Sequence, residues 1–97
     1  MNKHIILLFI ILCIGLTKAS AQHSITGKVL DATNQEPIPF ASVTIKNVKS
    51  GTTTDNNGNF TLKVNNNDIL IVSFMGYETK EVNIGTQKKV TILLSES

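Results

Sequence analysis

Apolar and polar residues alternate in short runs along most of the chain. Such alternation is typical of a β-strand with one buried face, because successive side chains point to opposite sides of a sheet. In the first run, residues 24–31, Ile25 and Val29 share one face, and in the second, residues 40–46, Val43 is predicted core. Further runs of strand length occupy residues 52–54, 60–64, 69–74, 78–84 and 90–94. The pattern predicts seven strands and no helix.

The segment 51–62 is the most informative part of this pattern. It begins with Gly51 and three threonines, which favour an extended strand because β-branched side chains fit a pleated sheet. A dense run of turn-forming residues follows, in which Asn57 and Gly58 can supply a positive φ. Alternation then resumes. We therefore predict a β-hairpin whose turn residues are Gly51, Asp55, Asn57 and Gly58.

Signals between the runs suggest how the strands are arranged. Pro37 and Pro39 cannot donate to a ladder and predict an extended, unpaired approach to the next strand. The unbroken apolar run 69–74 predicts a strand covered on both faces. Gly76 marks a bend, and the polar run 78–84 predicts an edge strand. Turns recur roughly every 8–12 residues, which indicates an all-β sandwich.

The start of the chain has the features of an export signal. An almost unbroken apolar run, residues 5–16, follows a short basic start, and Ala19 and Ala21 form the A-x-A arrangement of a cleavage site. The apolar run is shorter than the ~20 residues that span a bilayer. We expect a signal peptide at residues 1–21 and a sandwich domain at residues 22–97, with no membrane span after cleavage.

Removal of the signal changes the charge. The chain carries nine lysines, no arginine and seven acidic residues, for a net charge of +2. Loss of Lys3 and Lys18 leaves seven lysines against seven acids, and these lysines are dispersed in the sequence. A nucleic-acid-binding domain has clustered basic residues, and a membrane-surface helix has a basic amphipathic stretch. Neither pattern is present, so neither partner is expected.

The single cysteine also falls in the predicted signal. Cys13 follows Leu12, whereas a bacterial lipoprotein site has a small residue before its modified cysteine, so we do not expect lipidation. Of the 97 residues, the 76 that remain after cleavage have no thiol and no disulfide. A core of this size is near the lower limit for independent folding. We expect the domain to work attached to something larger or to oligomerise.

Catalytic and metal-binding patterns are weak. His23 is the only histidine of the predicted domain and lies near its start, where we expect it to be mobile, so no Ser-His-Asp or Cys-His set can form. Asp55 and Asp68 both fall in turns, where aspartates usually cap their own backbone. The Asp55 turn resembles the start of a calcium loop, but its twelfth position is Asn66, not the glutamate of an EF-hand. We expect no enzyme, no cofactor and no metal site, with weak calcium binding at Asp55 left open.

Sugar binding has thin support. The chain has no tryptophan, and Phe60 and Phe74 are better explained as core residues. Phe40 and Tyr77 remain beside loops and form the candidate ligand surface. A small carbohydrate- or peptide-binding sandwich is therefore the alternative to a protein-interaction module.

Four segments together resemble a known family, the carboxypeptidase regulatory-like domain. They match it in order and spacing and cover nearly the whole predicted domain: residues 25–31, 36–43, 51–60 and 73–77. The resemblance implies a transthyretin-like, seven-stranded Greek-key sandwich. Phe40 lies where many members of the family have glycine.

The resemblance also implies a role. In the family, this domain often follows a signal peptide at the N-terminus of SusC-like TonB-dependent outer-membrane transporters, in the periplasm before the plug and barrel. It also occurs attached to exported enzymes and in short proteins. The 97 residues hold no segment that we expect to form a plug, barrel or catalytic domain, so transport and peptidase activity are not expected of them. The sequence leaves open whether they form a stand-alone protein or part of a transporter. We therefore expect an exported, non-catalytic accessory module that binds a protein in the periplasm or outer membrane, with residues 78–84 as its contact edge.

Overall fold

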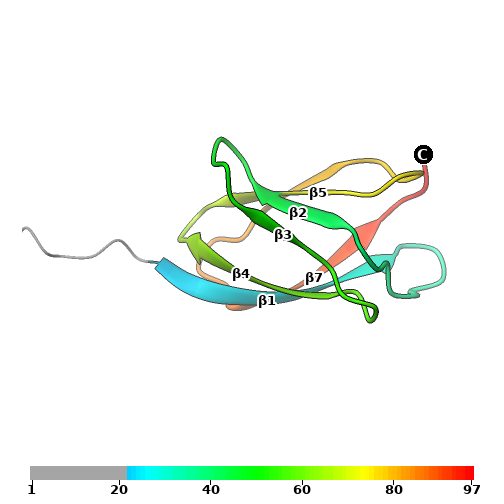
Figure 1. Cartoon of the computed structure of the whole chain (residues 1–97), viewed down its shortest axis with the longest axis horizontal. Helices are drawn as coiled ribbons and strands as arrows, with labels where there is room; N and C mark the ends of the chain where they lie inside the picture. The colour runs from blue at the N-terminus through cyan, green and yellow to red at the C-terminus, as the bar shows by residue number, and fades with distance from the viewer. Residues whose placement is uncertain (1–21) are drawn as a thin grey trace, which may run out of the picture.

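The computed structural model describes residues 22–97 and contains seven strands (Figure 1). The predicted signal peptide, residues 1–21, lies outside the described residues. The strands are β1 (Gln22–Asp31), β2 (Ser42–Ile45), β3 (Gly51–Thr53), β4 (Asn59–Asn65), β5 (Ile69–Ser73), β6 (Lys80–Asn83) and β7 (Lys89–Leu94). Each lies within or close to a run of alternation, so the prediction of seven strands is confirmed.

The strands form two sheets, with orders β4-β1-β7 and β3-β2-β5-β6. All pairs are antiparallel except β1 and β7, which run parallel. A parallel neighbour cannot follow by a tight turn. β2 to β6 lie between β1 and β7 in the chain, and all of them except β4 belong to the second sheet. The two sheets lie face to face (Figure 1). The predicted all-β sandwich is therefore confirmed.

The core lies between the sheets and follows the alternation. In β4 the odd positions are exposed and the even positions are buried. Val43 and Leu70, from neighbouring strands of the second sheet, are fully buried. The buried apolar residues are Ile25, Val29, Ile38, Ala41, Val43, Ile45, Phe60, Leu62, Val64, Leu70, Val72, Ile84, Ile92 and Leu94. In the alternating runs, the faces read from the sequence are thus the faces that pack.

The predicted hairpin over residues 51–62 is wrong. β3 pairs with β2, whereas β4 pairs with β1 in the other sheet. The connection between β3 and β4 therefore crosses from one sheet to the other at the side of the sandwich. Alternation alone could not reveal this, because it identifies the buried face of a strand but not its neighbour.

Two other local predictions need correction. Ile69 and Ile71 stay only half-buried on the outer face of β5, so the strand is not covered on both sides. The proline loop is partly paired rather than unpaired, because Pro37 forms a bridge with Leu30 of β1. The next residue, Ile38, is buried and donates its N–H to the carbonyl of Val29 at 2.9 Å. The predicted edge strand is confirmed as β6.

Candidate functional site

The Asp55 turn is closed by its own carboxylate. Asp55 Oδ1 accepts the backbone N–H groups of Asn57 and Asn59, each at 2.9 Å. Gly58 alone of the Asn57-Gly58 pair has a positive φ, at 76°. One of the two carboxylate oxygens of Asp55 is thus occupied by two backbone donors.

Asp55 and Asp68 cap opposite ends of β4. Asp55 binds the start of the strand, and Asp68 Oδ2 accepts the N–H of Asn65 at its end, at 2.8 Å. A strand rises about 3.3 Å per residue, so the two turns lie about 20 Å apart. They cannot act as a pair of acid and base. Within residues 22–97, no three His, Cys, Asp or Glu side chains are grouped so that they could hold a metal ion.

His23 is an ordered strand residue, contrary to the expected mobile terminus. It lies in β1 opposite Val64, and its Nε2 is 3.0 Å from the carbonyl oxygen of Gln87. This contact ties the start of β1 to the turn before β7. No cysteine lies within residues 22–97, so a Cys-His pair cannot form there.

Tyr77 makes the shortest polar side-chain contact described. Its hydroxyl donates to Asp31 Oδ2 at 2.6 Å, while Asp31 Oδ1 accepts the N–H groups of Thr33 and Asn34. The Tyr77 hydroxyl and these two N–H groups lower the pKa of Asp31. The Asp31 hydrogen bond, with burial, raises the pKa of Tyr77 to about 12. The ring packs beside Phe74, with centroids 6.2 Å apart. The polar end of Tyr77 is therefore already engaged within the protein.

Phe40, the other residue of the candidate ligand surface, is free of such contacts. Its side chain is 64% exposed, and its φ of 60° is in the left-handed region. Glycine would adopt this conformation without the steric cost that a Cβ brings. Gly76 precedes Tyr77 with a φ of 88° at the predicted bend, whereas Gly51 is the first residue of β3.

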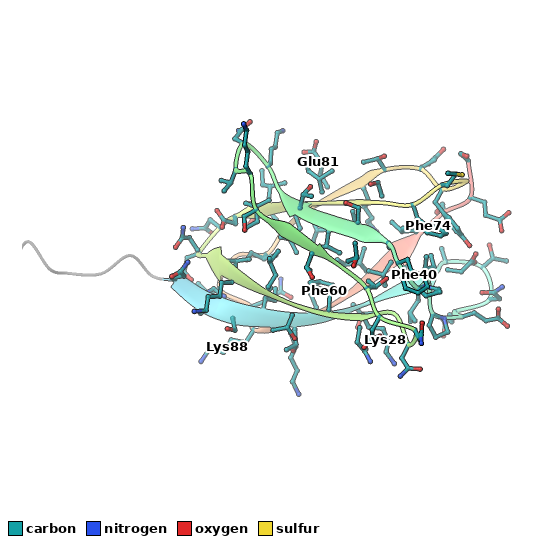
Figure 2. All side chains as sticks on the ribbon, viewed as in Figure 1. Lys28, Phe40, Phe60, Phe74, Glu81 and Lys88 are labelled. Carbon is teal, nitrogen blue, oxygen red and sulfur yellow. The ribbon has the colours of Figure 1, made fainter. Side chains whose placement is uncertain are left out.

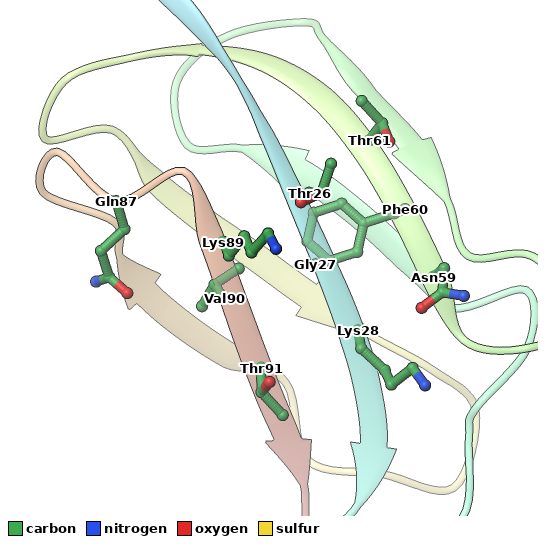
Figure 3. Close-up of a pocket in the computed structure, with 10 residues that line it drawn as sticks. All are labelled: Thr26, Gly27, Lys28, Asn59, Phe60, Thr61, Gln87, Lys89, Val90 and Thr91. Carbon is green, nitrogen blue, oxygen red and sulfur yellow. The ribbon is translucent and has the colours of Figure 1, made fainter.

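An open hollow lies on the outer face of the β4-β1-β7 sheet. The backbone around Gly27 lies at its base, and outward-pointing side chains line it (Figure 3). Its volume is about 600 Å³, and it is open to solvent. The outward-pointing lining residues are Thr26, Lys28, Asn59, Thr61, Lys89 and Thr91. They offer hydroxyl, amide and ammonium groups and no carboxylate. The sequence indicated these outward-pointing residues, because they are the polar positions of the alternating runs.

The β6 edge presents free backbone groups. Ile84 donates its N–H to the carbonyl of Asp68, and Val82 lies opposite Leu70, so the even positions of β6 face β5. By the alternation of antiparallel ladders, Glu81 and Asn83 direct their N–H and C=O groups away from the sheet. An extended peptide can pair with such groups.

Two buried polar residues were missed by the sequence analysis. Thr54 is 1% exposed and Asp31 is 4% exposed. Both hold loops in place by hydrogen bonds to groups distant in the sequence. Neither a threonine in a strand-forming run nor an aspartate beside a loop indicates such long-range bonds in the sequence. No buried side-chain N or O atom of the described residues lacks a hydrogen-bond partner.

The fold and these surfaces define a class, a small two-sheet β-sandwich with polar outer faces. A family model for the CarboxypepD_reg-like domain matches residues 25–97. The chain belongs to this family. The resemblance noted in the sequence is thus confirmed.

The relatives and a solved structure agree with this assignment. The chain is 34% identical over 92 residues to the TonB-dependent receptor SusC of Bacteroides thetaiotaomicron, covering 95% of this chain and 9% of that protein. It is 28% identical over 93 residues to the TonB-dependent receptor P3 of Formosa agariphila, again covering 95% and 9%. The chain thus spans about a tenth of the length of these relatives.

A crystal structure of a protein of unknown function from Bacteroides fragilis NCTC 9343 has the same fold, with a TM-score of 0.58 and 24% identity. The match covers 80% of this chain and 29% of the other. Across residues 22–97, we find no helix of the length and apolarity that crossing a membrane requires.

Proposed function

We propose that the chain is an exported, non-catalytic accessory module that binds a partner protein in the periplasm or at the outer membrane. The observation that carries this proposal is the match of nearly the whole chain to a tenth of TonB-dependent receptors. A segment of that size is an appended domain, and its outer faces are polar sheet surfaces rather than a catalytic cleft.

The β6 edge is the contact surface that we propose for this role. Glu81 and Asn83 face outward with unpaired backbone groups, as described above. β6 is short and charged, which prevents indiscriminate pairing with other chains and favours a specific partner strand. The side chain of Glu81 forms an ion pair with Lys46 at 3.2 Å.

Export is tested by the mass of the protein recovered from its producing cells. We expect the chain to begin at Gln22, because cleavage after Ala21 removes the predicted signal peptide. Recovery of the whole chain from the cytoplasm would contradict both the signal peptide and the proposed location.

Partner binding is tested by photo-crosslinking in those cells. A crosslinking amino acid at Asn83 should capture one defined protein, because the β6 edge faces the partner. The same amino acid at Thr53, on the β3 edge across the sheet, is the matched control and should capture none. Equal capture at both positions, or capture at neither, would refute the β6 contact.

The alternative function is a small sugar- or peptide-binding sandwich, and the exposure of Phe40 favours keeping it. An exposed aromatic ring in a strained backbone conformation is a recurrent feature of binding sites. A glycan array would support this alternative if a clear hit disappeared in Phe40→Ala and in Tyr77→Ala. An array without hits leaves the accessory module as the better account.

A further inference from the structure

The outer face of the β4-β1-β7 sheet carries one sign of charge. Its charged outward residues are Lys28 on β1, Lys63 on β4 and Lys89 on β7. The only acidic residue in these three strands is Asp31, which is buried. We call the outward residues Thr26, Lys28, Thr61, Lys63, Lys89 and Thr91 the lysine face. In Figure 2, Lys28 lies on the side of this sheet away from the second sheet.

None of these lysines is neutralised by the protein itself. Within residues 22–97, the ion pair formed is Lys46–Glu81, which belongs to the other sheet. Asp55 and Asp68 lie near the ends of β4, where each closes its own turn, and neither forms an ion pair with a lysine of this face. Although residues 22–97 carry equal numbers of lysines and acidic residues, the lysine face is positive.

The strand registers give the three lysines a regular spacing. Lys63 lies opposite Ser24 of β1, Lys89 lies beside Thr26, and Lys28 is two residues further along β1. Along the strand direction, successive lysines are therefore two residues apart, a step of about 7 Å, which is also the repeat of side chains on one face of an extended peptide. Because they lie on three neighbouring strands about 4.8 Å apart, the lysines form a zigzag that spans about 14 Å along the strands and not a straight row.

We propose that the lysine face is a docking surface for an extended acidic segment of a partner protein, with a carboxylate at every second residue. Charge complementarity supports an anionic occupant, and the regular step supports an extended peptide over a compact anion. The peptide segment would lie in the hollow around Gly27, where Thr26 and Thr61 contribute hydroxyl groups. The proposal rests on the proposed function as a protein-binding module, and it adds a second surface to the β6 edge.

The experiment measures binding of a fluorescent twelve-residue peptide with alternating glutamate and serine to the purified chain. A peptide with the same composition, but with its glutamates in one block, tests the spacing. We expect saturable binding of the alternating peptide, weaker binding of the block peptide, and a loss of affinity between 50 and 500 mM salt, conditions chosen because salt screens exposed charges.

The variant Lys28→Gln/Lys63→Gln/Lys89→Gln should weaken binding about tenfold, because three exposed ion pairs together contribute about that factor. As a matched pair of single variants, Lys28→Gln should weaken binding about twofold, whereas Lys49→Gln, in the loop between β2 and β3, removes one charge away from both proposed surfaces and should leave the affinity unchanged. Thermal melting of the three variants shows whether they remain folded.

Several results would overturn the proposal. These are absence of saturable binding, equal effects of Lys28→Gln and Lys49→Gln, and equal binding of the two peptides. Binding of polygalacturonate or of anionic vesicles, with no binding of the alternating peptide, would assign the lysine face to another class of partner. Binding of none of these probes would mean that the lysine face is a solvated surface only. If only the lysine-face proposal is wrong, the crosslink at Asn83 is still formed. If the proposed function as a protein-binding module is wrong, that crosslink is absent as well.

Discussion

Thr54 joins the two sides of the loop between β1 and β2, although it lies outside every strand. Its hydroxyl donates to the carbonyl of Ile38 at 2.7 Å and accepts the N–H of Ala41 at 2.8 Å. Its own backbone pairs with Ala41 and with Phe40. All of the hydroxyl contacts are buried, so water cannot replace them.

Thr54→Val removes this hydroxyl while keeping the shape of the side chain. The Ile38 carbonyl and the Ala41 N–H then lose their partners inside the protein. A buried polar group without a partner costs about 1–3 kcal/mol, and the added methyl group returns about 0.8 kcal/mol. We expect Thr54→Val to lower the free energy of unfolding by about 2–4 kcal/mol.

Thr54→Ser is the matched control. It keeps the hydroxyl and removes one buried methyl group, which costs about 1 kcal/mol. The order of stability is therefore wild type, then Thr54→Ser, then Thr54→Val. Burial of apolar surface alone would place valine above serine.

Urea unfolding followed by circular dichroism measures this difference. A domain of this size has a stability of about 4–11 kcal/mol, so a loss of 2–4 kcal/mol is a large shift of the midpoint. If Thr54→Val were as stable as Thr54→Ser, or lost less than about 1 kcal/mol, the hydroxyl would not satisfy these two backbone groups.

Three other predictions concern the turns and the tyrosine. Gly58→Ala should cost more than about 2 kcal/mol in urea unfolding, because a Cβ would lie 2.7 Å from a backbone oxygen, whereas Gly76→Ala, with a similar φ and open space, should cost about 1 kcal/mol. Phe40→Gly should leave stability unchanged or raise it by up to about 1 kcal/mol, because it relieves a left-handed φ. Tyr77, the only tyrosine, should ionise at a pKa of about 12 in an absorbance titration, and Asp31→Asn should bring this pKa back toward 10.

The tyrosine prediction has a definite sign in the dependence of stability on pH. The folded pKa of Tyr77 is raised from its ordinary 10.0, so its contribution is complete below pH 10 and is lost as the pH rises toward 12. The folded pKa of Asp31 is lowered from 3.8, so its contribution is present above that value and is lost as the pH falls below it. A Tyr77 midpoint near 10 in the folded protein would contradict the hydrogen bond.

Equal costs for Gly58→Ala and Gly76→Ala would mean that backbone conformation alone, and not the contact with Val29, makes Gly58 necessary. A clear loss of stability in Phe40→Gly would show that the exposed ring contributes packing energy that outweighs its strain.

The sequence by itself determined the strands and, in the alternating runs, their buried faces; for β5, whose run is apolar throughout, it did not. Alternation is a local property, since each strand must turn its apolar side chains to one side, and so Ile25, Val43 and Leu62 could be assigned to the core. The Asp55 turn and the Gly76 bend were equally local, because turn chemistry needs only neighbouring residues.

Only the tertiary structure decided which strands are neighbours. β3 and β4 adjoin in sequence but belong to different sheets, because the pairing of a strand depends on the core that the whole chain can bury. The same long-range folding brings Tyr77 to Asp31, 46 residues away, and Ile38 under Gly58. The spacing of the three lysines likewise exists only through the registers of β1 with β4 and β7. The residue pattern along one strand does not determine the distances between side chains on three neighbouring strands.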